Sequence, residues 1–508
     1  RSEYTGSAGV VAADQLENAQ VSNVTKALSG KMAGVQTISN NGQPGTSATV
    51  YVRGVGSINT SAQPLYVVDG MPYDGEISNI AASDIEQLTV MKDAASTALY
   101  GARGANGVII ITTKRGSEGN AKVTLDASWG ANGRSLPTYD IIKSPEQYLE
   151  VLYQTMYMQQ RGLGASPAAA NAYANENLWL GAMQTFSVPA GQSFIGMNGK
   201  LNPAATRGYS DGTYYYTPDN WIDHTFRNGL RQEYALTITG GTQKLNYYVS
   251  GSYLNDEGIL EGSHFQRFSS RINVDYQAKP WLKVGTTSNY VYTNSGYPSQ
   301  QTAGSDNSTA NAFAVAYQIA PIYPIFARSA DGAVLRDPAT GKPIYDYGMG
   351  QEFNSLGAKM MARPSGAWAT ANPAGAMIYD KREFIGDVLD SKWYAILTPI
   401  EGLTISGTAG LYLNNQRFHN LDNNLYGQLV SSGGGAQQQH ARYSTLNLQA
   451  LASYNRTFND VHNFDIMVGA ESQDYAMEYV VGSGNYLYMP GNWFLSNTIN
   501  NWTVGGGR

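Results

Sequence analysis

The sequence predicts a small mixed α/β unit at the N-terminus, followed by a large antiparallel sheet of long β-strands that belongs to a transmembrane β-barrel. Three observations lead to this fold class. Short apolar strands and glycine-rich turns fill residues 1–117, later segments of about ten residues or more alternate apolar and polar side chains, and the connections between those segments alternate between short and long. About ten alternating residues are enough to cross a bilayer at a tilt, whereas the strands of a sandwich average about five or six.

The composition is compatible with such a barrel. The chain has 508 residues with 56 Gly, 36 Tyr and 14% charged residues, which is too long for one ordinary core and too aromatic for a disordered chain. It contains no run of about 18 apolar residues, so membrane-spanning helices are excluded. The mean hydropathy of −0.32 still allows a membrane location, because barrel strands alternate apolar and polar residues and average out to a hydrophilic chain.

No pattern in the sequence indicates an enzyme, a metal site or a cofactor. The absence of cysteine excludes disulfides, thiolate catalysis and Cys-based zinc sites, and the net charge of −6 argues against a nucleic-acid partner. No Gly-x-Ser-x-Gly elbow is present, and the adjacent carboxylates Asp256 and Glu257 are interpreted as solvated turn residues. The histidines show no metal-ligand spacing: His224, His264, His419, His440 and His462. We therefore expect no catalytic residue, no bound metal and no cofactor.

The first 117 residues carry brief signals for helices and strands. Helices are predicted over 24–28 and 93–100, where Asp93 would cap the first turn and Gly101 would end the helix. Strands are predicted between them, at 35–39, 48–52, 64–69 and 107–113. Together these elements make a small mixed α/β unit.

Three motifs follow one another in this unit. They are Val52-Arg53-Gly54, then Tyr66-Val67-Val68-Asp69-Gly70, then a glycine-studded turn that runs from Leu99 into an apolar strand and ends at Gly116. Taken singly, each glycine only supplies a positive φ in a turn. The turn after Leu99 does not match a phosphate-binding loop, because it lacks a Gly-Lys-Ser/Thr ending and is followed by a strand rather than a helix.

In this order, the motifs closely resemble the plug domain of the SusC/RagA family of TonB-dependent outer-membrane transporters. The resemblance implies that residues 1–117 are a plug and that residues 118–508 are the N-terminal part of the surrounding barrel. It also implies structural or gating roles for the motif residues, which are Arg53, Gly54, Asp69, Gly70, Tyr100, Gly101, Arg103 and Gly104. Of these, Arg53 and Arg103 are expected to pair with carboxylates of the barrel wall or of the plug.

The later segments alternate most clearly over 267–277. There, Phe268, Ile272, Val274 and Tyr276 fall on one face, and Arg267, Arg271, Asn273, Asp275 and Gln277 fall on the other. Nine strands are predicted in all, at 121–130, 231–239, 244–255, 265–277, 281–293, 387–398, 402–414, 443–456 and 461–472. Bacterial barrels have an even number of strands, about 22 in the largest transporters, so we expect this chain to be the first part of a longer polypeptide.

The connections indicate how the barrel is oriented. Short turns at 240–243, 278–280, 399–401 and 457–460 alternate with longer connections at 131–230, 256–264, 294–386 and 415–442. Outer-membrane barrels have short periplasmic turns and long extracellular loops, so 131–230, 294–386 and 415–442 are predicted to be extracellular. A capped helix is predicted from Ser144, and the stretch after Gln473 is interpreted as part of another outer loop. Aromatic residues near strand ends are candidates for interface girdles: Trp129, Trp281, Tyr290, Tyr292, Trp393 and Tyr394.

The family resemblance implies active import across the bacterial outer membrane. A SusD-like surface lipoprotein would serve as a lid, and TonB with its inner-membrane energising complex would pull on the plug from the periplasm. Dimers of transporter–lid pairs are expected, and the family's TonB-contacting segment is expected to precede Arg1. Oligosaccharides are the expected cargo. Oligopeptides, as in RagA, are the alternative, because Tyr- and Trp-rich loops suit both.

Two other classes of protein make different structural predictions. A passive porin or surface adhesin predicts an open lumen without a folded N-terminal plug. A soluble secreted β-protein, such as a glycoside hydrolase, predicts paired catalytic carboxylates and a second sheet covering the apolar residues Leu446, Leu448, Ala450 and Ala452. The import hypothesis requires instead that these apolar side chains face lipid while the N-terminal unit lies on the opposite, inner face of the sheet.

Overall fold

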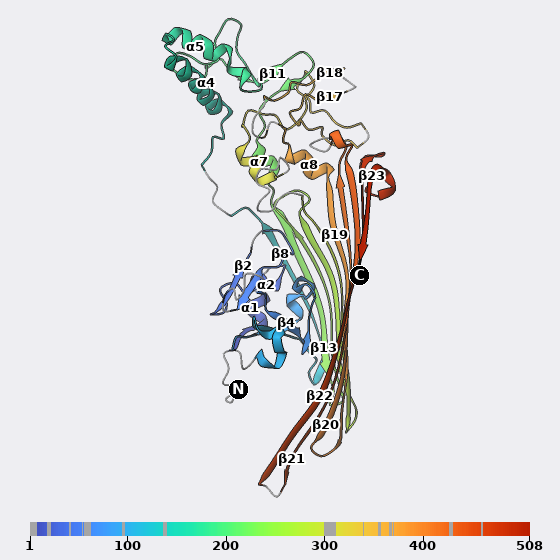
Figure 1. Ribbon diagram of the computed structural model, residues 1–508. Coiled ribbons are helices and arrows are strands. Elements are labelled where there is room, and N and C mark those ends of the chain that lie inside the picture. The colour runs from blue at the N-terminus through green and yellow to red at the C-terminus, as the bar shows by residue number, and fades with distance from the viewer. Residues whose placement is uncertain are drawn as a thin grey trace.

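The computed structural model describes residues 8–17, 22–39, 42–52, 54, 62–93, 97–135, 140–298, 311–338, 340–353, 357–364, 368, 370–425, 430–458 and 461–507. Figure 1 shows an N-terminal unit lying beside one long, curved sheet, with loops and short helices gathered at one end of that sheet. The elements of the N-terminal unit end with β7 (Val108–Thr113), and the long sheet begins with β8 (Gly119–Asn132).

The N-terminal unit is built on a five-stranded mixed sheet. The strand order is β1 (Ala8–Ala12), β6 (Ile85–Met91), β7, β4 (Leu65–Val68) and β5 (Met71–Pro72), while β2 (Val35–Ile38) pairs separately with β3 (Thr49–Val52). The connecting elements are α1 (Ala13–Glu17), α2 (Val24–Ala27), η1 (Ile77–Asn79), η2 (Ala82–Asp84) and η3 (Ala98–Gly104). Apolar side chains of these strands and helices, among them Val11, Leu28, Ile85, Val90 and Ile109, form one buried core.

Most of the elements predicted for this unit are present. The helix predicted at 24–28 and the four predicted strands are confirmed by α2, β2, β3, β4 and β7. The helix predicted at 93–100 falls partly on residues 94–96, which lie outside the described residues, and 98–104 form a 3-10 helix interrupted by Gly101 at φ 57°. Strands β1 and β6, which pair with each other, are additional to the prediction.

The long sheet contains ten antiparallel strands in sequence order. These are β8, β13 (Gly229–Gly241), β14 (Leu245–Glu257), β15 (His264–Lys279), β16 (Leu282–Gly296), β19 (Lys381–Ile400), β20 (Leu403–Asp422), β21 (Gly435–Phe458), β22 (His462–Leu487) and β23 (Thr498–Gly507). Each strand pairs with its neighbours in the chain, and among the described residues the edge strands β8 and β23 do not pair with each other.

All nine predicted strands are found in this sheet, but the interpretation of the last segment is wrong. Residues after Gln473 were expected to form a loop, yet they continue β22 as far as Leu487 because they pair with β21 along its whole length. A tenth strand, β23, then returns along β22. Glycines such as Gly482 and Gly484 obscured the extension of β22 in the sequence, since glycine is depleted in strands.

The two faces of the long sheet have opposite character. On β15, Phe268, Ile272 and Tyr276 are 50, 46 and 44% exposed, whereas Arg267 and Arg271 on the other face are only 2 and 1% exposed. Exposed apolar and buried charged side chains are the reverse of the pattern in a soluble domain. The apolar face is called here the outer face, and the face that carries Arg271 the inner face.

The same reversal holds further along the sheet. Leu446 and Leu448 on β21 are 42 and 46% exposed, and Ala450 is exposed. The soluble-protein hypothesis required these residues to be buried against a second sheet. They are not, so the structure argues against that hypothesis.

The connections divide the sheet into two ends. One end, called here the turn end, has only short links, at 242–244, 280–281, 401–402 and 459–461. The opposite end, called here the loop end, has the longer links, at 133–228, 258–263, 297–380, 423–434 and 488–497. Because most strands extend further than predicted, the long links are somewhat shorter than expected.

Helices and short strands fill the long links. They are α4 (Pro145–Gly162), α5 (Pro167–Glu176), η4 (Leu178–Leu180), β9 (Phe186–Ser187), β10 (Thr206–Arg207), β11 (Tyr209–Ser210), β12 (Tyr215–Tyr216), α6 (Trp221–Thr225), α7 (Ala312–Gln318), β17 (Glu352–Phe353), β18 (Ala358–Lys359), α8 (Pro373–Tyr379), η5 (Val430–Ser432) and η6 (Leu495–Asn497). The helix predicted from Ser144 is confirmed as α4, with the Ser144 side chain accepting a hydrogen bond from the backbone N–H of Gln147. Among the described residues, no helix is both long and apolar enough to cross a membrane.

Two side-chain predictions have different outcomes. The interpretation of Asp256 as a solvated turn residue is wrong, because it lies on β14, is 5% exposed and accepts a hydrogen bond from Asn132 Nδ2 at 2.6 Å. Four of the six proposed girdle aromatics are strongly exposed, namely Trp129, Trp281, Tyr290 and Trp393. Their position in membrane interfaces stays a prediction.

Candidate functional site

The inner face of β15 holds the N-terminal unit through two buried arginines. The alternation of β15 places Arg267 and Arg271 on the same face, four residues apart. Arg271 Nε lies 3.6 Å from Asp84 Oδ2, and Arg271 Nη1 lies 3.9 Å from Asp69 Oδ2. All three side chains are at most 3% exposed, so these charges are compensated away from water.

Neutral donors from the sheet complete the contact with Asp84. Asp84 Oδ1 accepts hydrogen bonds from Tyr248 Oη at 3.0 Å and from Ser250 Oγ at 2.6 Å, both on β14. Arg267 Nη1 donates to the carbonyl oxygen of Ser78 at 2.8 Å. The N-terminal unit is therefore attached to the sheet by buried hydrogen bonds and ion pairs as well as by apolar packing.

The Asp69-Gly70 motif forms the turn between β4 and β5. Both residues have positive φ, 47° and 85°, as a two-residue hairpin turn of this kind requires. Asp69 accepts hydrogen bonds from the backbone N–H and the hydroxyl of Thr113 at 3.0 and 2.7 Å. Its carbonyl oxygen accepts a hydrogen bond from Lys392 Nζ on β19 at 2.5 Å. This motif therefore links the core of the N-terminal unit to the long sheet.

The Tyr100–Gly104 motif also reaches the long sheet. Arg103 Nη2 lies 2.6 Å from Asp74 Oδ1, and Arg103 Nη1 donates to Gln473 Oε1 on β22 at 2.9 Å. The expected carboxylate partner of Arg103 thus lies within the N-terminal unit. The pair is partly exposed, so each of its members is in contact with solvent.

The glycines of the motifs are needed for two different reasons, a positive φ or a close approach of the backbone. Gly54, Gly70 and Gly101 have positive φ, as predicted from the turns. Gly104 does not; a Cβ there would lie 2.7 Å from the carbonyl oxygen of Thr97, so this position needs glycine for close approach. Arg53 lies outside the described residues.

A cavity opens between the N-terminal unit and the loop end of the sheet. It has a volume of about 560 Å³ and is lined on one side by Ser47, Glu76 and Asn79 of the N-terminal unit. The sheet contributes aromatic rings and amide side chains, which include Phe265, Tyr297, Phe384, Phe418, Asn414, Gln416 and Gln439. A second cavity of about 290 Å³ lies at the same end, and Tyr297 and Arg382 line both.

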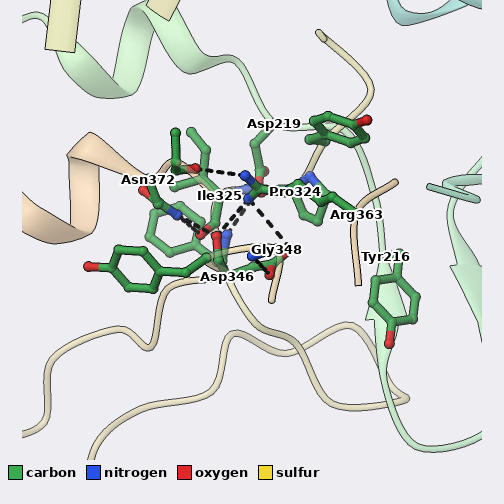
Figure 2. Close-up of polar contacts among 12 residues, drawn as sticks. Tyr216, Asp219, Pro324, Ile325, Asp346, Gly348, Arg363 and Asn372 are labelled. Carbon is green, nitrogen blue, oxygen red and sulfur yellow. Dashed lines mark hydrogen bonds and ion pairs between the residues drawn. The ribbon is translucent and has the colours of Figure 1, made fainter. Parts of the chain in front are cut away.

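A buried arginine organises the loops above these cavities. Arg363 donates to the carbonyl oxygens of Ala371, Pro324 and Asp346 at 2.7, 3.1 and 2.6 Å, and its side chain is fully buried (Figure 2). The Asp346 carboxylate lies 3.6 Å from Arg363 Nη2. Burial raises the pKa of Asp346 above its ordinary value, and the neighbouring guanidinium opposes that rise.

Asn372 extends this cluster to further loop segments. Its Nδ2 donates to the carbonyl oxygens of Ile325 and Asp346, both at 2.8 Å, as Figure 2 shows. Nearby, Arg328 and Asp219 form a 2.6 Å ion pair. These contacts join segments from two of the long links, so the loops form one packed layer with its own apolar core.

The sequence analysis identified only part of this arrangement. It placed Arg267 and Arg271 on one strand face but did not identify Asp84 as their partner, since a single aspartate in a polar turn has no distinguishing pattern. Arg363, Asp346 and Arg382 lie in segments without clear periodicity. Among the described residues, no group of three or more His, Cys, Asp or Glu side chains is placed to hold a metal ion.

Comparison with known proteins relates this arrangement to one class of receptor. Residues 1–108 match the family model of the TonB-dependent receptor plug domain. The chain is 28% identical to the TonB-dependent receptor SusC of Bacteroides thetaiotaomicron, over 94% of this chain and 42% of that protein. It is 27% identical to the TonB-dependent receptor P3 of Formosa agariphila, over 93% of this chain and 39% of that protein. The chain thus spans less than half the length of these relatives.

Solved structures show the same fold. The chain superposes on the RagAB peptide transporter with a TM-score of 0.69, and on the closed-closed state of the RagAB peptide importer with a TM-score of 0.72. Both have 22% sequence identity and cover 99% of this chain and 52% of the solved chain. At this sequence identity the likeness shows the fold of the chain.

Proposed function

We propose, on the premise that this chain is a SusC/RagA-type TonB-dependent receptor, that it takes part in active import of oligosaccharides across the bacterial outer membrane. One observation carries this proposal. The N-terminal unit is attached by buried ion pairs to the inner face of a sheet whose outer face exposes Phe268, Ile272 and Tyr276. An apolar outer face can contact lipid, and a folded unit on the inner face can close the pore of a transporter.

In this proposal residues 1–117 are the plug and residues 118–508 are the N-terminal part of the barrel. The loop end is extracellular, and the turn end faces the periplasm, from which TonB would reach the plug. The motif residues would hold the plug closed or let it move; they are Arg53, Gly54, Asp69, Gly70, Tyr100, Gly101, Arg103 and Gly104. The contacts of Asp69 with Lys392 and of Arg103 with Gln473 support such a role, because both join the plug to the wall.

The cavity of about 560 Å³ is the proposed ligand site. It lies on the side of the plug that faces the loops, where a ligand released by a SusD-like surface lipoprotein would arrive. Aromatic rings pack against the apolar faces of sugars, and the amides of Asn79, Asn414 and Gln416 can bond to hydroxyl groups. We expect the lipoprotein to contact the loop layer and the complexes to form dimers of transporter–lid pairs.

Oligopeptide import is the second candidate, because aromatic and amide side chains also contact peptides well. A passive porin or adhesin is less well supported, because the folded N-terminal unit would obstruct an open lumen. The relatives described above are receptors, and nothing in the site favours catalysis.

Uptake experiments test the proposal. A strain that lacks the complete receptor should lose uptake of a fluorescent oligosaccharide, and a strain that lacks TonB should lose it too. Uptake of defined peptides serves as the comparison. If the receptor deletion abolished peptide uptake and left all oligosaccharide uptake intact, the cargo assignment would be wrong. Uptake that persisted without TonB would contradict active transport.

A further inference from the structure

Arg382 stands out at the loop end of the inner face. It lies on β19 ten residues before Lys392, so the alternation of the strand places both side chains on the inner face. Its guanidinium lies 4.9, 5.5 and 5.4 Å from the ring centres of Tyr297, Phe384 and Phe418. Arg382 lines both cavities at this end.

The rings hold the guanidinium but do not neutralise its charge. Among the described residues, the side chain of Arg382 makes no hydrogen bond and has no carboxylate within 4.0 Å, and its buried Nε has no hydrogen-bond partner. Cation–π contacts orient a cation without satisfying its N–H donors. The donors of Arg382 are therefore available to a ligand in the cavities.

The carboxylates that line the two cavities are already engaged elsewhere. Glu76 accepts a hydrogen bond from Ser47 Oγ at 3.3 Å, and Asp380 accepts two from Asn423, at 2.8 and 2.6 Å. Glu383 accepts one from Asn294 Nδ2 at 2.8 Å, and lies 3.5 Å from His419 Nδ1. None of these carboxylates forms an ion pair with Arg382. Asp422 interacts with Arg382 electrostatically, but it lines neither cavity and lies beyond ion-pair distance, so the guanidinium at the shared wall of the cavities has no ion-pair partner among the described residues.

From this arrangement we infer that Arg382 binds the carboxylate of an acidic sugar unit, so that the cargo is an acidic oligosaccharide. This inference rests on the proposed import function. A planar guanidinium matches a carboxylate through two parallel N–H···O bonds. The neighbouring rings and the amides of Asn414 and Gln416 suit the uncharged part of a sugar, which favours an acidic glycan over an acidic peptide.

Calorimetric binding to the complete receptor tests this inference. The probes are a hexamer of galacturonic acid and the same hexamer with every carboxylate methyl-esterified, which removes charge and keeps the sugar chain. The wild-type receptor should bind the acid about 10- to 100-fold more tightly than the ester, as a hydrogen-bonded charge predicts. Arg382→Gln should remove this preference, and Arg382→Lys, which keeps the charge, should retain part of it.

A matched control removes one positive charge from the same loop end. Arg207 forms an exposed ion pair with Glu146, and it does not line either cavity. Arg207→Gln should therefore leave the preference for the acid unchanged. A shift in electrophoretic mobility on heating checks that each variant contains a folded barrel.

Several results would overturn the inference. Equal binding of acid and ester by the wild-type receptor would do so, as would an undiminished preference in folded Arg382→Gln, or tighter binding of an acidic hexapeptide than of the acid hexamer. The import proposal has a separate test, because TonB-dependent uptake of neutral oligosaccharides would support it even if Arg382 had no effect.

Discussion

Replacement of Arg271 by methionine should weaken the attachment of the plug to the barrel wall. Arg271 is 1% exposed and lies near the carboxylates of Asp69 and Asp84, which are 3 and 2% exposed. Methionine fills similar volume but leaves both carboxylates without this cation. Removing one member of a buried ion pair typically costs about 3–5 kcal/mol, because the remaining charge is desolvated and uncompensated. The fraction of receptors with a detached plug should rise by about a hundred- to several thousand-fold.

A single cysteine can report this detachment, because the chain contains no other cysteine. Ser78 is 8% exposed and lies at the interface, where its carbonyl oxygen accepts a hydrogen bond from Arg267. Ser78→Cys changes only the side-chain oxygen to sulfur. When opening and closing are fast relative to labelling, the rate of reaction with a thiol reagent follows the fraction of open molecules. The Arg271→Met variant should therefore label much faster than its parent.

Two controls separate the ion pair from general damage. Arg103→Met removes a half-exposed ion pair, with side chains 43 and 29% exposed, and should change labelling by less than about fivefold. In an Asp84→Asn background, Arg271→Met should have a smaller effect, because one of the two carboxylates has already lost its charge. Labelling of Arg271→Met at the parental rate would refute the reasoning that this buried pair attaches the plug.

Three further changes test other parts of the structure. Arg363→Met should leave Asp346 buried without its cation and loosen the loop layer by about 3–5 kcal/mol, measured as faster proteolysis within the loops; unchanged proteolysis would contradict this. Gly45→Ala should lower the stability by at least about 1–2 kcal/mol, because φ of Gly45 is +76° and a Cβ there would lie 2.2 Å from the ring of Phe265. A melting temperature equal to that of the parent would show that the contact with Phe265 is not tight. Burial raises the pKa of Asp380 from 3.8 to about 6, so the folded state binds the proton more tightly than the unfolded state. Protonated Asp380 therefore stabilises the fold fully below pH 3.8, and this stabilisation is lost as the pH rises through 6. Asp380→Asn should therefore stabilise the protein at pH 8 by at most about 3 kcal/mol and have little effect near pH 4, in melting experiments at both pH values; equal effects at the two pH values would contradict the assignment.

Local patterns in the sequence were enough to identify the strands. A strand repeats every two residues, so each segment such as 267–277 shows in itself which side chains share a face. The same rule explains why the outer and inner faces were assigned correctly for Phe268 and Arg271. It failed after Gln473, because the extension of β22 depends on its pairing with β21 and β23 more than on its own glycine-rich residues.

The sequence by itself therefore determined the strand positions, the orientation of their faces and the family to which the motifs point. Tertiary structure alone decided which charges meet: Arg271 with Asp84, Arg103 with Asp74 and Gln473, and Arg363 with Asp346. It also decided that Arg382 has no carboxylate within 4.0 Å among the described residues. The physical reason is the separation of the residues along the chain. Alternation is a property of adjacent residues, whereas an ion pair depends on how the packed fold brings together segments that are far apart in the chain.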